Sequence, residues 1–140
     1  MAGKKILIAD DEARLRKLVS DYLVREGYEV LEAADGEQAL DIFYREKDLS
    51  LMILDVMMPG VDGFMVCKEV RETSQIPIVM LTAKSEENDI LNGYEYGADE
   101  YIPKPFSPKI LVAHVNAIIR RTSDADDGNK DLLEAGGIVI

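Results

Sequence analysis

Five short apolar segments recur along the chain, and each is followed by a stretch with the residue spacing of an amphipathic helix. The apolar segments lie at 4–9, 28–33, 51–54, 76–81 and 100–102. Strands and helices that alternate with short connections form a parallel sheet with helices on both faces. The sequence therefore predicts a doubly wound α/β fold with a five-stranded parallel sheet and five helices.

The helical patterns lie at 14–27, from 35–36 onward, at 64–72, at about 86–96, and from 108 to about 121. Gly27 suits the end of the first helix. Ser107 suits the N-cap of the last helix, with Pro108 at its first position. The single cysteine, Cys67, falls inside an apolar helical pattern, so we expect a buried side chain rather than a nucleophile.

The composition changes after residue 121. Residues 122–131 are polar and acidic, as in a linker, and residues 132–140 become apolar again. We therefore expect one domain at 1–121, a linker at 122–131, and the start of a truncated C-terminal effector domain at 132–140.

The overall charge and hydropathy exclude several classes of protein. A formal net charge of -11 argues against nucleic-acid binding by this segment, because such binding needs clustered Lys and Arg. No apolar run approaches the roughly 20 residues of a membrane span. There is also no signal-peptide pattern. We expect a cytoplasmic protein that does not bind membranes.

Polar side chains follow four of the five predicted strands. They are Asp10 and Asp11, Asp55, Thr82 and Lys104. The carboxyl ends of parallel strands meet at one edge, where open α/β sheets bind ligands. Carboxylates 4 Å apart repel by roughly 4 kcal/mol per pair at an effective dielectric near 20, so a cation is needed, and Mg²⁺ suits oxygen ligands. An acid nucleophile, a metal, a lysine and a hydroxyl together suit phosphoryl transfer to a carboxylate.

Four motifs have matching spacings: the acid pair at 10–11, DVMMPGVDG at 55–63, Thr82-Ala83, and GADEYIPKPF at 97–106. Together they closely resemble the receiver domain of two-component response regulators, over about residues 4–121. The resemblance implies the flavodoxin-like receiver fold. It also implies a phosphoacceptor that catalyses its own phosphorylation and dephosphorylation without being a conventional enzyme.

The resemblance further implies a role for each matching residue. Asp55 would accept a phosphoryl group from a phosphohistidine on a sensor histidine kinase. The Mg²⁺ ligands would be Asp10, acting mainly through water, Asp11, Asp55 and the backbone carbonyl of Met57.

The remaining motif residues would bind the phosphoryl group and transmit its arrival. Lys104 and Ala83 would bind phosphate, and the Lys104-Pro105 bond would be cis. Thr82 and Tyr101 would form the switch pair that reshapes the face made by the fourth helix, fifth strand and fifth helix.

SPKILVAHVNAIIRR at 107–121 resembles regulators of the OmpR/PhoB type, whose receiver precedes a winged-helix DNA-binding domain. This implies transcription regulation, DNA binding through the missing C-terminal domain, and a possible homodimer on phosphorylation through the switch face. Asp99, Glu100 and Arg121 fit that dimer. Three residues depart from the usual charges: Asn92, Ile110 and His114. We therefore predict weaker or differently arranged dimerisation.

Other interpretations compete with this one. Within the family, the alternative is a stand-alone chemotaxis-like receiver that binds a partner protein. A flavin binder of the same fold would need Gly, Ser and Thr runs that the loops lack. A haloacid-dehalogenase-like phosphatase would need an acid at Met57. Taken alone, Asp10-Asp11 would more often cap a helix than bind a metal. Met57 and Lys84 flank the expected path of attacking water, which suggests slow self-dephosphorylation.

Overall fold

The computed structural model describes residues 3–83 and 97–135, with side chains described for 3–83 and 97–122. Five strands form one sheet: β1 (Lys5–Ala9), β2 (Glu29–Ala33), β3 (Leu49–Asp55), β4 (Ile78–Ala83) and β5 (Glu100–Lys104). Their order is β2-β1-β3-β4-β5, and every neighbouring pair is parallel. The predicted five-stranded parallel sheet is confirmed, with strand ends within two or three residues of those expected.

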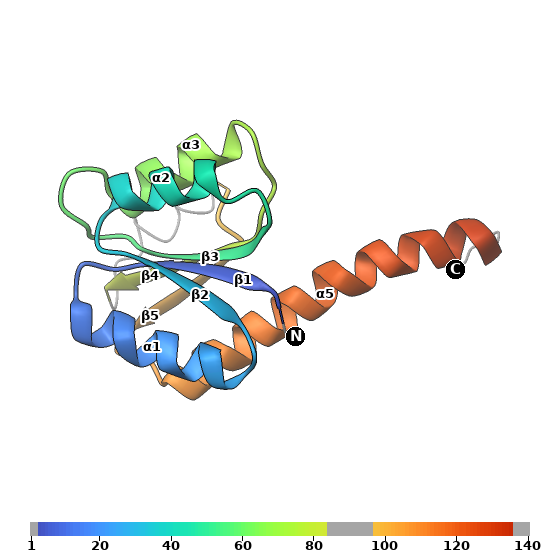
Figure 1. The fold of residues 1–140 in the computed structure, drawn as a ribbon, viewed down its shortest axis with the longest axis horizontal. Helices are drawn as coiled ribbons and strands as arrows, with labels where there is room; N and C mark the ends of the chain where they lie inside the picture. The colour runs from blue at the N-terminus through green and yellow to red at the C-terminus, as the bar shows by residue number, and fades with distance from the viewer. Residues whose placement is uncertain (1–2, 84–96, 136–140) are drawn as a thin grey trace.

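Helices cover both faces of the sheet (Figure 1). α1 (Ala13–Arg25) and α5 (Pro108–Ala135) lie on one face, and α2 (Gly36–Arg45) and α3 (Gly63–Arg71) lie on the other. The helix expected at about 86–96 falls outside the described residues.

The central strand β3 shows why the apolar run at 51–54 is continuous. Leu51 and Ile53 pack in the cluster under α1 and α5, whereas Met52 and Leu54 pack in the cluster under α2 and α3. Successive side chains of a strand point to opposite faces, so a strand covered on both faces needs apolar residues at every position. All four side chains are fully buried. The strand then ends at Asp55, which is itself buried.

Two helices begin at side-chain caps that the sequence indicated. Asp35 accepts a hydrogen bond from the Gln38 backbone N–H at 2.8 Å, and Asp62 accepts one from Met65 at 2.9 Å. Such caps satisfy backbone donors that the first helical turn leaves unpaired. They fix the starts of α2 and α3, and Pro108 begins α5 as expected.

The end of the last helix was predicted wrongly. We expected it near Arg121, followed by a linker at 122–131, but α5 continues to Ala135. Figure 1 shows its second half projecting beyond the sheet. The polar stretch therefore does not end the helix, and it contains no proline that would interrupt one. The division into receiver, linker and effector start remains a prediction.

Candidate functional site

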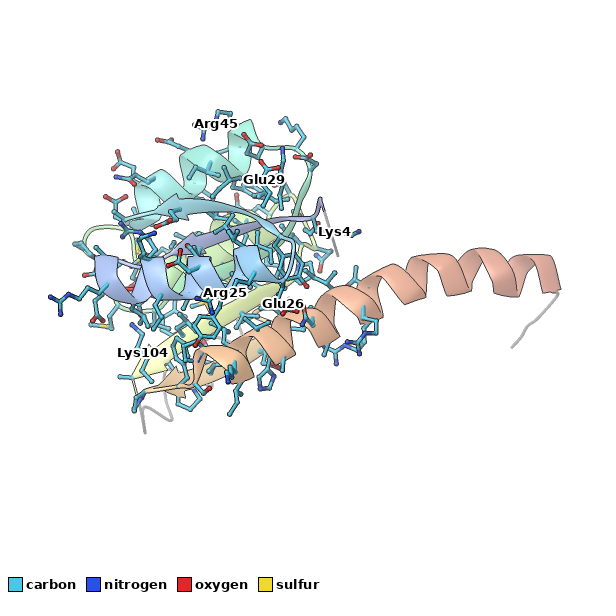
Figure 2. All side chains as sticks on the ribbon, turned by 60° about the horizontal axis from the view of Figure 1, so that its bottom comes forward. Lys4, Arg25, Glu26, Glu29, Arg45 and Lys104 are labelled. Carbon is cyan, nitrogen blue, oxygen red and sulfur yellow. The ribbon has the colours of Figure 1, made fainter. Side chains whose placement is uncertain are left out.

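The carboxyl ends of three strands bring together the charged residues expected at this edge. Asp10 directly follows β1, Asp55 ends β3 and Lys104 ends β5. One carboxylate oxygen from each of Asp10, Asp11 and Asp55 lies within 4.8 Å of the others. Figure 2 shows Lys104 at the end of the molecule opposite Lys4, which precedes β1. We call Asp10, Asp11, Asp55 and Lys104 the acid edge.

Lys104 contacts both buried acids of this edge. Its Nζ lies 3.2 Å from Asp55 Oδ2 and 3.3 Å from Asp10 Oδ2. Asp10 is fully buried and Asp55 is 4% exposed, whereas Asp11 is exposed to solvent. Among the residues that the structure describes, one lysine contacts two of these three carboxylates, so the acid edge carries a surplus of negative charge.

The pKa values of the buried groups reflect this surplus. Burial, and then the neighbouring Asp10 carboxylate, raise the pKa of Asp55 to about 6, although Lys104 partly offsets both effects. Burial acts to lower the pKa of Lys104, but Asp55 and Asp10 outweigh it, so that this pKa is raised. Lys104 therefore stays positively charged, whereas the crowding of carboxylates makes Asp55 harder to ionise.

The remaining oxygen contacts show what the acid edge can bind. Asp10 Oδ1 accepts a hydrogen bond from the Glu12 backbone N–H at 2.9 Å, and Asp55 Oδ1 accepts one from Met57 at 3.3 Å. Three carboxylates with surplus negative charge and one solvent-exposed member fit a hard divalent cation that prefers oxygen ligands. The donor set thus suits a metal, while the Met57 carbonyl remains a predicted ligand.

The expected phosphate-binding and switch residues lie around the acid edge. Ala83 pairs with Lys104 in the sheet register. Thr82 is fully buried, and its hydroxyl has a long 3.4 Å contact with the Ala83 carbonyl. Tyr101 is half-buried, packs against the cluster under α2 and α3, and pairs with Met80 in the register. Thr82 and Ala83 lie at the carboxyl end of β4, whereas Tyr101 lies near the start of β5, and the roles of all three remain predictions.

Two further features lie beside the acid edge, one of them expected from the sequence and the other not. The Lys104-Pro105 bond is cis, as expected. A cavity of about 450 Å³, which was not predicted, adjoins Lys104. Its lining residues are Glu12, Leu15, Ala83, Lys104, Pro105 and Phe106.

Sequence reasoning missed two residues that contact the backbone of the acids. Arg16 of α1 donates from Nη1 to the Asp10 carbonyl oxygen at 2.6 Å. Gly63 lies so close that a Cβ there would be 2.4 Å from the Asp55 carbonyl oxygen. Neither backbone contact has a local signal in the sequence.

A second charged cluster lies at the amino ends of β4 and β5. We call Arg71 and Asp99 the root cluster, in which Arg71 Nη2 lies 2.9 Å from Asp99 Oδ2. The same Asp99 oxygen accepts a hydrogen bond from the Ile78 backbone N–H at 2.7 Å. Arg71 also donates to three backbone carbonyls, those of Gly97, Ser74 and Ile76.

The fold and the acid edge together define a class of protein, a doubly wound α/β protein with an acidic, metal-compatible site at the carboxyl end of its sheet. The family model described as response regulator receiver domain matches residues 6–116. The chain belongs to this family. The resemblance predicted from the motifs is confirmed.

Full-length relatives add information on the subfamily. The chain is 48% identical over 139 residues to the probable transcriptional regulator ycf27 of Porphyridium aerugineum, covering 99% of this chain and 57% of the relative. It is 50% identical over 119 residues to the transcriptional regulatory protein ResD of Bacillus subtilis, covering 85% and 49%. The chain thus spans about half the length of these relatives. It is a receiver domain of the kind found in transcriptional response regulators, and the chemotaxis-like alternative is not favoured.

Solved structures agree with this assignment. A putative response regulator from Chloroflexus aurantiacus has a TM-score of 0.78 at 39% identity, over 84% of this chain and 98% of that one. DrrB, a Thermotoga maritima OmpR/PhoB homologue, has a TM-score of 0.76 at 35% identity, over 87% and 54%. These similarities confirm the OmpR/PhoB type. Within the described ranges, no helix has the length and apolar character needed to cross a membrane.

Proposed function

We propose that Asp55 accepts a phosphoryl group from a phosphohistidine on a sensor histidine kinase, with Mg²⁺ bound at the acid edge. One observation supports this above all. Asp55 ends strand β3 with its Oδ2 3.2 Å from Lys104 Nζ, beside the carboxylates of Asp10 and Asp11. A nucleophile, a fixed cation and a metal-binding acid pair are the groups that phosphoryl transfer requires.

In the proposed reaction, a carboxylate oxygen of Asp55 attacks phosphorus while the bond from phosphorus to the histidine nitrogen breaks. A pKa of about 6 leaves Asp55 mostly ionised at neutral pH and therefore able to attack. Lys104, which contacts Asp55 before the reaction, then also pairs with the oxygens of the transferred phosphoryl group. Mg²⁺, when bound, supplies further neutralisation of the phosphoryl charge. Because the protein itself is modified, it acts as a phosphoacceptor rather than a conventional enzyme.

The added group carries about two negative charges, which gives the switch residues a new partner. The Thr82 hydroxyl makes only a 3.4 Å contact now, so a phosphoryl oxygen would offer it a stronger acceptor. Tyr101 then changes its packing, and the face formed by α5 and β5 is altered. Relatives named transcriptional regulators are about twice as long as this chain, which supports output through a DNA-binding C-terminal domain. The proposal retains a cytoplasmic location.

We also propose that phosphorylation produces a homodimer through this face, and that this dimer is weaker than, or arranged differently from, the usual one of the subfamily. Asp99 already pairs with Arg71 within the chain, and Glu100 Oε2 lies 2.5 Å from His114 Nδ1. Asp99 and Glu100 are therefore both already in contact with side chains of their own chain. Ile110 is 57% exposed on α5, where an acid is usual in the subfamily. Equal dimerisation of phosphorylated wild type and Ile110→Glu in ultracentrifugation would exclude a role for this position.

Slow self-dephosphorylation also remains a proposal. Met57 is 67% exposed beside Asp55, where its side chain can obstruct water on its way to a phosphoryl group. Lys84 lies outside the described residues. A phosphoryl half-life of seconds in the presence of Mg²⁺ would contradict this proposal.

The decisive experiment is intact-mass measurement after incubation with acetyl phosphate and Mg²⁺. We expect one phosphoryl adduct on wild type and none on Asp55→Ala or on wild type with a chelator. Asp21→Ala is the matched control, because Asp21 is an exposed acid on α1 that pairs only with Lys17 in the described contacts. An adduct that persists in Asp55→Ala, or a folded wild type without any adduct, would refute the proposed function.

A further inference from the structure

We propose that Arg16 is a positioning residue that holds the turn between β1 and α1, and thereby directs Asp10 and Asp11 into the acid edge. This inference rests on the proposed function, because the two acids matter as ligands for the Mg²⁺ proposed there. It adds a residue of α1 that touches neither the metal nor the phosphoryl group.

Arg16 joins three parts of the chain that are separate in the sequence. Its Nη1 donates to the Asp10 carbonyl oxygen at 2.6 Å, and its Nε donates to Glu32 Oε1 at 2.9 Å. Only 18% of the Arg16 side chain is exposed. The guanidinium of α1 therefore ties the end of β1 to β2, using the planar donor geometry that distinguishes arginine from lysine.

Every polar atom of Asp10 has a partner, and three of these partners lie outside the acid edge. Its N–H donates to the Ala33 carbonyl at 3.1 Å, its carbonyl accepts from Arg16, and its Oδ1 accepts from Glu12. Only Oδ2 faces Lys104, at 3.3 Å. The orientation of this fully buried side chain is thus set by its surroundings, and Arg16 supplies the contact on the carbonyl from which Asp11 follows.

A helix cap would be the ordinary way to fix such a turn, and it is absent here. Asp35 and Asp62 cap α2 and α3 with their side chains, but the N-cap of α1, Glu12, makes no side-chain cap hydrogen bond. The neighbouring acids are used at the acid edge instead of capping the helix. Arg16 compensates by binding the carbonyl directly, and without it a partly buried acceptor would lose its partner.

The contribution of Arg16 is one of geometry rather than charge. A lone guanidinium near three carboxylates would compete with a divalent cation, but Glu32 pairs with Arg16 and neutralises it. Two variants separate the two effects. Arg16→Lys keeps the charge and loses the forked geometry, whereas Glu32→Gln alters the charge and keeps the contact with Asp10.

The test is Mg²⁺ affinity, measured from the rise of the melting temperature as Mg²⁺ is added to each variant without any phosphodonor. Each variant is compared with its own metal-free state, so a change in basal stability does not alter the result. We expect both Arg16→Ala and Arg16→Lys to lose affinity by roughly tenfold or more, as is typical when groups that orient metal ligands are removed. Glu32→Gln should change affinity much less. Lys17→Ala, at an exposed neighbour on α1, should bind as wild type does.

Hydrogen exchange at the Glu12 amide provides a second readout that needs no metal. This amide donates to Asp10 Oδ1, so it should exchange faster in Arg16→Lys than in wild type or Lys17→Ala. If Arg16→Ala does not fold, Arg16→Lys decides the question.

The outcomes separate the inference from the proposed function. Wild-type affinity and unchanged exchange in Arg16→Lys would overturn the positioning role and leave the proposed function intact. A wild type that does not bind Mg²⁺ would contradict the proposed function. The exchange rate of the Glu12 amide would then decide alone whether Arg16 holds the turn.

Discussion

The two ends of the sheet hold charge in opposite ways. At the acid edge, Lys104 contacts two of the three carboxylates, Asp55 at 3.2 Å and Asp10 at 3.3 Å, and the pKa of Asp55 is raised to about 6. At the root cluster, Arg71 donates both to Asp99 and to backbone carbonyls, and the Asp99 oxygen accepts a further backbone hydrogen bond. The acid edge has more negative charges than positive ones, whereas each charged side chain of the root cluster has several hydrogen-bond partners.

This difference indicates what each end does. Crowded carboxylates reduce stability, and proteins retain such arrangements where a function needs them. A charged side chain that donates to several acceptors stabilises the fold, because removing it leaves those acceptors unpaired. The acid edge therefore has the character of a ligand-binding site, whereas the root cluster joins α3 to the starts of β4 and β5. Removing a charged side chain, Asp55 at one end or Arg71 at the other, should change stability in opposite directions.

The largest expected effect is the loss of stability in Arg71→Ala. The substitution leaves the Gly97 and Ile76 carbonyls and the Asp99 carboxylate without this donor, and the Arg71 side chain is only 14% exposed. We expect a loss of about 3 kcal/mol in the free energy of unfolding, measured by urea denaturation.

Arg45→Ala is the matched control for Arg71→Ala. Arg45 is 62% exposed and contacts only Glu46, at 3.6 Å, among the described ion pairs. Its removal should cost about 0–1 kcal/mol. Equal losses of unfolding free energy in the two variants would show that the contacts of Arg71 stabilise the fold no more than an exposed ion pair does.

The next effect has the opposite sign. Asp55→Asn should stabilise the metal-free protein by about 2 kcal/mol at neutral pH, because it removes a carboxylate whose ionisation the fold opposes. The pKa of Asp55 in the folded protein, about 6, lies above its ordinary value of 3.8. The folded state therefore binds this proton more tightly than the unfolded state, and stability falls as pH rises between these values.

The difference between wild type and Asp55→Asn should follow the same course with pH. It should be small below pH 3.8, grow up to about 6, and then stay constant. Urea denaturation at several pH values in a chelating buffer measures it. A variant less stable than wild type at neutral pH, or a gap that does not depend on pH, would show that Asp55 is not under electrostatic strain.

The grouping of residues at the acid edge could be predicted because the position of each residue follows from the sequence of its own strand. Each strand is a short apolar run that ends in a polar residue, and parallel strands bring those ends together, so Asp10, Asp55 and Lys104 could be grouped without knowing any contact. The caps at Asp35 and Asp62 have local signals of the same kind. What could be predicted was the position of each residue along its own element.

The root cluster and Arg16 could not be predicted, because they depend on side chains that reach other elements. Arg71 contacts Asp99 across 28 residues, and Arg16 contacts Glu32 across 16. Nothing in the spacing distinguishes these arginines from exposed ones such as Arg45. The extent of α5 was missed for a different reason, since a polar stretch can be either a loop or a helix that lacks covering protein.

A smaller loss of stability is expected for Gly63→Ala at the start of α3. The new Cβ would lie 2.4 Å from the Asp55 carbonyl oxygen and 3.0 Å from Met80 Cε. The helix must therefore move away from β3, which should cost about 2 kcal/mol. It should also lower the rate of adduct formation with acetyl phosphate, because the Asp55 backbone shifts. Unchanged stability and unchanged adduct formation would mean that this end of the sheet adapts without cost.

The smallest effect is expected for Gly60→Ala, in the turn between β3 and α3. Gly60 has a positive φ of 75°, and a Cβ there would have nothing within 4 Å. The substitution thus costs only the backbone preference against this conformation, about 1 kcal/mol. Adduct formation should remain at the wild-type level, since no atom of Asp55 is displaced. If Gly60→Ala instead impaired adduct formation as strongly as Gly63→Ala, the turn itself would be part of the acid edge. The site at this end of the sheet would then include backbone outside the four charged residues of the acid edge.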